Sequence, residues 1–242
     1  MTKCHKWTLA LLGMVVLAMP SAGSFAQTRI GVAASTKPNA DGFVGAGSQS
    51  LSAGSEVFAN ETVRTGNVGQ ADLVFVDKTN LTVGPTSEVL LDKFVYDPTG
   101  PKGKVVLQLS RGAFRFVTGT QDHSAYAVNT PYGSLGVRGT TVEVVVSEKK
   151  KPRPDECVTR VRLVEGAGAS FTLPSGRTAQ LTNINETICV TQNGTVTHGS
   201  SSTSILGFQV AGETPPPSIG GITPPPGIGP PTIPPCVTNC QP

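Results

Sequence analysis

Short runs in which apolar and polar residues alternate fill the chain between Thr28 and Val210. Alternation with a period of two places one side of each run inside a fold, which is the pattern of half-buried β-strands. Turn-forming residues separate the runs, and patterns with a helical period are nearly absent. The sequence therefore predicts an all-β domain. The inward positions of the clearest runs are Val105, Leu107 and Leu109; Phe114 and Phe116; Val142, Val144 and Val146; and Val161 and Leu163.

Two similar units indicate how the strands are arranged. Gly54–Val57 reads GSEV and Thr86–Val89 reads TSEV, each a turn followed by the start of a strand. The run Ala71–Val76 is apolar on both sides, so we expect it deeper in the fold. We predict a single domain of short strands in a roll or solenoid-like stack, with a two-sheet β-sandwich as the alternative.

The first 26 residues have the features of a cleavable secretory signal peptide. Lys3 and Lys6 precede an apolar run from Leu9 to Met19, and a small-residue site ends at Ala26. The run is shorter than the roughly 20 residues of a membrane-spanning helix, so we expect a periplasmic or secreted protein that is not membrane-spanning. Removing this segment takes two of the 19 basic residues and none of the 16 acidic ones, leaving a net charge of +1. Binding to nucleic acid through overall charge is therefore not expected.

Residues 213–242 differ in composition from the rest of the chain. Half of them are Pro or Gly, and no charged residue follows Glu213. Such a segment buries too little apolar surface to offset the entropy of ordering it, so we expect a disordered tail that acts as a linker or a docking strip.

Four cysteines remain after the signal peptide: Cys157, Cys189, Cys236 and Cys240. An even number in an oxidising compartment favours disulfides, either Cys157 with Cys189 and Cys236 with Cys240 or another pairing. A zinc site is the alternative, but the tight CxxC pairs and neighbouring histidines of such sites are missing.

The stretch Asn129–Thr140, NTPYGSLGVRGT, is the densest cluster of turn-forming residues. We interpret it as two turns around a short strand, in which Arg138 ties turn carbonyls together or pairs with Glu165. Ligand binding by Arg138 is the alternative. The residues expected to maintain the local fold are Thr130, Pro131, Gly136, Arg138, Gly139 and Thr140.

A basic tip lies between two expected strands. Its charged residues are Lys149, Lys150, Lys151 and Arg153, next to two prolines. It is either a solvated hairpin loop or a docking point for an anionic surface or an acidic protein.

No catalytic, cofactor-binding or metal-binding pattern is recognisable. His123 and His198 are the only histidines after the signal peptide, and neither belongs to a known catalytic motif. Asp92 and Asp97 could flank a sugar but read better as turn residues. The only tryptophan, Trp7, lies in the signal peptide, so a sugar ring would have to stack on Tyr96, Tyr126 or Tyr132. We therefore expect no enzyme, and an activity that depends on His123 would contradict this.

Several motifs follow one another along the chain: Val63–Gly66, Ala71–Asp77, Leu81–Asp92, Leu109–Phe116, Thr130–Pro131 with Val137–Thr140, and Val164–Gly166. In this order they resemble the FecR domain family. The resemblance implies a relation to inner-membrane regulators whose periplasmic part senses an outer-membrane receptor and whose cytoplasmic part controls a sigma factor. This chain instead has a cleavable signal and no spanning helix, so only the periplasmic module is expected.

The expected organisation follows from these observations. An N-terminal strand region (27–53) precedes the FecR-type domain (54–171), and a C-terminal β extension (172–212) leads to the tail. We expect a non-enzymatic sensing or scaffold module of the cell envelope that binds another envelope protein, by strand addition at an exposed edge. The alternative is a glycan- or peptidoglycan-associated binding module.

Overall fold

The computed structural model describes residues 27–96, 103–149 and 151–210. Five predictions concern residues outside this part of the chain: the signal peptide (1–26), Asp97, Lys150, the pair Cys236 and Cys240, and the tail (213–242). No helix in the described part is long and apolar enough to cross a membrane.

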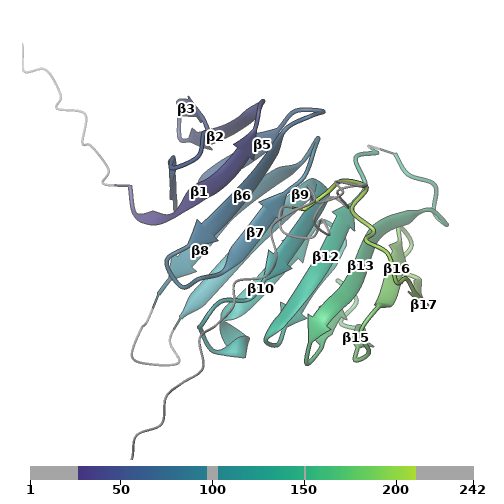
Figure 1. Ribbon diagram of the computed structural model, residues 1–242. Helices are drawn as coiled ribbons and strands as arrows, with labels where there is room; N and C mark the ends of the chain where they lie inside the picture. The colour runs from purple at the N-terminus through teal and green to yellow at the C-terminus, as the bar shows by residue number, and fades with distance from the viewer. Residues whose placement is uncertain (1–26, 97–102, 150, 211–242) are drawn as a thin grey trace, which may run out of the picture.

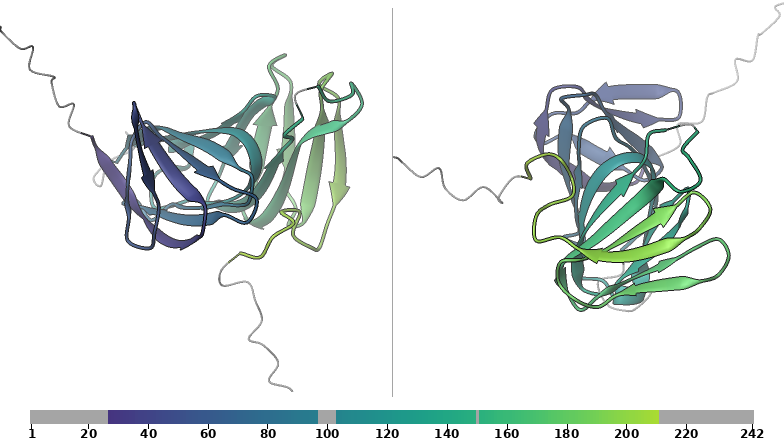
Figure 2. Two further views of the ribbon diagram at one scale, coloured as in Figure 1. Left: turned by 90° about the horizontal axis from the view of Figure 1, so that it is seen from above. Right: turned by 90° about the vertical axis from the view of Figure 1, so that its right-hand side faces the viewer.

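The described residues contain seventeen strands, which form one continuous open sheet that folds into two faces (Figures 1 and 2). Every neighbouring pair is antiparallel except β9 and β10, which run parallel. In spatial order, face A contains β4 (Glu56–Phe58), β1 (Arg29–Lys37), β6 (Gln70–Phe75), β7 (Asn80–Val83), the end of β9 (Lys104–Val117), β12 (Thr140–Val146), β13 (Cys157–Gly166), β16 (Glu186–Thr191) and β17 (Val196–Ser200). Face B contains β3 (Gly47–Ser50), β2 (Ala40–Val44), β5 (Glu61–Thr65), β8 (Glu88–Val95), the start of β9, β10 (Tyr126–Thr130), β11 (Gly133–Val137), β14 (Ala169–Thr172) and β15 (Thr178–Leu181).

This arrangement confirms the prediction of an all-β stack of short strands. The chain alternates between the faces while it advances from one end of the stack to the other, as the colour gradient in Figure 2 shows. Strands of the segments 27–53 and 172–212 continue the stack on either side of the central segment. The sheet does not close, because β3 and β4 end it at one side and β15 and β17 at the other, each with a strand partner on one side only.

Strand β9 joins the two faces, and Gly112 is where it passes from one to the other. Its first half pairs with β8 and β10 in face B, and its last residues pair with β7 and β12 in face A. Gly112 has φ 103°, and a Cβ there would lie 2.0 Å from Ser87 Oγ. The same hydroxyl oxygen accepts a hydrogen bond from Ala113 N at 3.0 Å. Only glycine fits this close crossing without strain.

One hydrophobic core fills the space between the faces. Phe114 and Phe116 of β9 and Phe171 of β14 are its largest fully buried side chains. The core extends from Ile30 near one end to Val190 near the other. The predicted inward residues of the alternating runs are all buried, including Val142, Val144 and Val146 in β12, Val161 and Leu163 in β13, and Val105, Leu107 and Leu109 in β9.

Candidate interaction surfaces

The turn of the NTPYGSLGVRGT stretch closes the hairpin of β10 and β11. Thr130 Oγ1 donates to the Gly133 carbonyl at 3.0 Å and accepts from Tyr132 N at 3.2 Å. A Cβ at Gly133 would lie 2.5 Å from the Phe171 ring, so the turn sits directly on the core. The Thr130 hydroxyl therefore bridges the two ends of this turn.

The second half of the stretch carries the chain from β11 in face B to β12 in face A. Gly139 has φ 54°, and a Cβ there would lie 2.8 Å from a carbon of the His123 ring. Thr140 N donates to Thr118 Oγ1 at 2.8 Å, and the Thr140 hydroxyl donates to the Glu165 carbonyl. This stretch is thus a backbone junction between the two faces.

The Arg138 guanidinium lies elsewhere than expected. Its main-chain N donates to the Gly168 carbonyl at 3.2 Å, but the side chain is exposed and has no hydrogen bond or ion pair to any described residue. The Thr140 hydroxyl, and not Arg138, donates a hydrogen bond to the Glu165 carbonyl. The guanidinium therefore bonds neither to turn carbonyls nor to Glu165. Two hydrogen bonds from Ser124 are the main cause of the lowered pKa of Asp122; the charge of Arg138 also contributes to lowering it, but less than the charge of His123.

A pocket of about 430 Å³ opens where three turns meet at the C-terminal end of the stack. The turn after β10 contributes Tyr132, the turn after β14 contributes Arg177, and the turn after β16 contributes Asn193. Arg177 Nη2 donates to the Gly194 carbonyl at 3.3 Å, which ties two of the turns together. The turns with Arg177 and Asn193 lead directly into the edge strands β15 and β17. The other lining residues are Pro131, Leu173, Pro174, Ser175, Thr191, Gln192 and Gly194.

The basic tip is the connection between β12 and β13, and part of its charge is neutralised. Lys149 forms an ion pair with Glu156 in the same loop, and this contact is the main reason that the Glu156 pKa lies below its ordinary value. Lys151 and Arg153 are exposed. The base of the loop is held by a disulfide between Cys157 in β13 and Cys189 in β16, which confirms that predicted pair. Among its described residues, the loop therefore presents the exposed cations Lys151 and Arg153 above a base that the disulfide braces.

The other polar residues singled out from the sequence do not gather into one site. His198 Nδ1 lies 3.1 Å from Glu186 Oε1, Asp92 accepts from Gln108 Nε2 at 3.1 Å, and His123 packs at the Gly139 junction. Within the described residues, no group of three or more His, Cys, Asp and Glu side chains could hold a metal ion.

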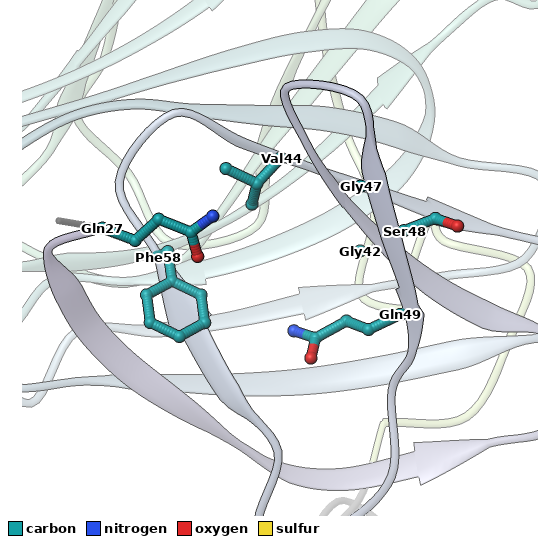
Figure 3. A pocket seen from close by; sticks show the side chains of 7 residues that line it. All are labelled: Gln27, Gly42, Val44, Gly47, Ser48, Gln49 and Phe58. Carbon is teal, nitrogen blue, oxygen red and sulfur yellow. The ribbon is translucent and has the colours of Figure 1, made fainter. Parts of the chain in front are cut away.

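A buried carboxylate that the sequence did not indicate lies near a small pocket at the opposite end of the stack. The pocket, about 180 Å³, is lined by Phe58, Gln49 and Gln27 among others (Figure 3). Behind it, Glu61 is fully buried and accepts from Phe58 N at 2.7 Å and from Gln49 Nε2 at 3.4 Å. Gly42 leaves the space that Glu61 fills, since a Cβ there would lie 1.8 Å from its Oε1. In the sequence, Gly42 is the only residue whose type could have indicated this buried carboxylate.

Burial raises the pKa of the Glu61 carboxyl above its ordinary value, while hydrogen bonds from Phe58 and Gln49 oppose the shift. An acid whose pKa is raised by folding stabilises the fold while it is protonated, below its unfolded pKa. This contribution is lost as the pH rises through the raised pKa. We therefore expect Glu61→Gln, which stays neutral, to gain stability relative to the wild type between about pH 4 and pH 7.

Urea unfolding of both proteins at the two pH values measures this difference. Glu148→Gln, at an exposed position, is the matched control and should leave the unfolding curves unchanged. A stability difference between Glu61→Gln and the wild type that stays constant with pH would show that Glu61 does not titrate differently in the fold.

Comparison with protein families matches residues 61–168 to the family described as FecR protein. The chain carries a FecR domain. The match lies within the predicted boundaries 54–171, and it begins at β5 and ends just before β14. The FecR domain thus occupies the middle of the stack, with further strands at both ends.

Two crystal structures similar to this chain are of a candidate anti-sigma factor from Parabacteroides distasonis ATCC 8503, at 2.50 Å and 1.65 Å resolution. Each shares 14% sequence identity, with TM-scores of 0.45 and 0.44. The similarity covers 57% of this chain and 59% of theirs. No curated protein matches the sequence.

Proposed function

We propose that this chain is a periplasmic or secreted, non-enzymatic FecR-domain protein that binds another protein of the cell envelope. The FecR family is regulatory, and the proposal assigns the sensing or scaffold part of such regulation to this chain. The location rests on the signal-peptide pattern of residues 1–26. The observation that carries the binding proposal is the open edge of face A at β17.

Strand β17 is the longest of the four edge strands and offers a free row of main-chain groups. Hydrogen bonds from Thr191 N to Thr195 O and from Ser201 N to Asn185 O, both 2.9 Å, fix the ladder between β16 and β17. In that register the main-chain groups of Val196, His198 and Ser200 point away from β16. Neither lysine nor proline blocks this edge, so an extended partner segment can add to it.

Substitution of His198 tests this edge. His198→Pro removes an N–H that faces the partner side, while the ladder with β16 does not use it. His198→Ala removes the same imidazole, with its contact to Glu186, but keeps the N–H. We expect crosslinking in the cell envelope to recover a specific protein with the alanine variant and at least about tenfold less with the proline variant. Equal recovery by both variants would rule out β17 as the binding edge.

The pocket at the C-terminal end favours a second candidate, binding to glycan or peptidoglycan. Tyr132 offers an aromatic ring, and Arg177, Gln192 and Asn193 offer polar groups around it. This combination of one ring and several hydrogen-bonding groups suits a sugar. Loss of cell-wall retention on Tyr132→Phe or Tyr132→Ala, with the envelope protein still recovered, would assign the pocket to glycan; unchanged retention would exclude it.

A further inference from the structure

Three charged side chains form a row on the outer side of face A, and two of them, Glu143 and Arg162, are buried. Glu143 of β12 lies directly opposite Arg115 of β9 and Arg162 of β13. Arg162 Nη1 is 3.2 Å from Glu143 Oε2, and Arg115 Nη1 is 3.9 Å from Glu143 Oε1. These side chains point away from the core, yet Glu143 is fully buried and Arg162 is only 8% exposed. Something other than the sheet must cover them.

The cover is the segment 201–210, which we call the strap. It crosses the strands of face A after β17, as the yellow-green trace in Figure 1 shows. Arg162 Nε donates to the Ser201 carbonyl at 2.8 Å, and Ile205 N donates to Glu143 Oε2 at 2.9 Å. The charged row therefore binds the main chain of the strap, through one carbonyl and one N–H.

Apolar side chains of the strap occupy two further positions on this face. Leu206 and Val210 pack with Ala113 in a small cluster that is separate from the main core. The Phe208 ring lies over Gly84, where a Cβ would come within 2.1 Å of it. Because Gly84 has no side chain, an aromatic ring can pack directly against its main chain. The face thus offers an apolar patch, a position at Gly84 where an aromatic ring can pack, and two charged groups that bind main-chain atoms.

The strap fits this face incompletely. It is not a strand of the sheet, and its apolar cluster is small and separate from the core. Glu143 Oε1 has no hydrogen-bond donor among the described residues. A buried carboxylate oxygen without a donor loses free energy that a better-matched segment would recover. The interaction of the strap with the face is therefore open to competition.

We propose that the outer side of face A is a docking site for an extended segment of another protein, which the strap occupies in the unbound chain. The partner segment offers a main-chain carbonyl to Arg162, N–H groups to both Glu143 oxygens, and an apolar residue followed two positions later by an aromatic one. Leu206 and Phe208 of the strap have this spacing. The site lies on the side of the sheet and does not depend on strand addition at β17.

The probe is a fluorescent synthetic peptide with the sequence of residues 201–210, SSTSILGFQV. Fluorescence anisotropy measures its binding to the full chain and to the full chain with Leu206→Ala and Phe208→Ala. We expect the variant to bind the peptide at least about tenfold more tightly than the wild type, because a tethered strap competes at high effective concentration. Circular dichroism confirms that the variant is folded, and Phe208→Ala alone serves if the double variant is not.

A second peptide with Ile205→Pro keeps Leu206, Phe208 and Val210 but lacks the N–H that reaches Glu143. It should bind the variant at least about tenfold more weakly than the parent peptide. Equal binding of both peptides would reduce the site to non-specific apolar adsorption and overturn the proposal. Absence of peptide binding to the folded variants would overturn it as well.

Discussion

Replacing Arg162 by alanine should lower the free energy of unfolding by about 3–5 kcal/mol, because it leaves a fully buried carboxylate without its nearest cation. Arg162 is 3.2 Å from Glu143 and also donates from Nη2 to Asn185 Oδ1 at 2.7 Å. The remaining cation, on Arg115, is 3.9 Å from the carboxylate. Urea unfolding followed by circular dichroism measures the change.

The neighbouring arginine of the same strand is the matched control. Arg160 points to the same side of β13 but is exposed, so Arg160→Ala should change stability by less than about 0.5 kcal/mol. Similar losses for Arg160→Ala and Arg162→Ala would mean that the row of charges is no more important than any surface arginine, and the account of the outer face would be wrong.

Gly112→Ala should destabilise the fold by about 3–5 kcal/mol, because backbone strain and a steric clash combine at one residue. Gly112 has φ 103°, and the new Cβ would lie 2.5 Å from Ser87 Cα, a backbone atom that cannot simply rotate away. The substitution disturbs the backbone at the point where β9 passes from one face to the other. Thermal and urea unfolding of the variant measure it.

Gly54→Ala separates strain from clash. Gly54 has φ 89°, close to that of Gly112, but nothing lies within 4 Å of the position of its Cβ. Only the conformational penalty applies there, about 1–2 kcal/mol. If the two variants lose equal stability, the close approach of β9 to Ser87 does not limit the crossing between faces.

The alternating runs were sufficient to predict the strands and which of their sides faces the core. Val142, Val144 and Val146 are buried as expected, because burial of one side of a strand is a local property of the sequence. The pair Cys157 and Cys189 was also predictable, since few pairings are possible for four cysteines. The FecR motifs were visible for the same reason, as short patterns in a fixed order.

The burial of side chains by a segment distant in the chain could not be predicted from the sequence. Alternation places Glu143 and Arg162 on the solvent side of their strands, and among the described residues it is the strap, some 60 residues further along the chain from Glu143, that covers them. Arg138 illustrates the opposite case, because a guanidinium expected to tie turns together is left exposed when Thr140 takes the carbonyl. Glu61 looked like an ordinary strand residue, and its burial depends on the space left by Gly42.

The most direct test of a partner in the envelope is crosslinking and affinity recovery of the tagged protein, alongside a version that ends at Val210 and so lacks the tail. Both forms should recover the same specific envelope protein. Neither form should retain cell-wall polymer beyond the background of an unrelated secreted domain. Recovery of wall polymer without any specific protein would contradict the account and support glycan binding at the Tyr132 pocket.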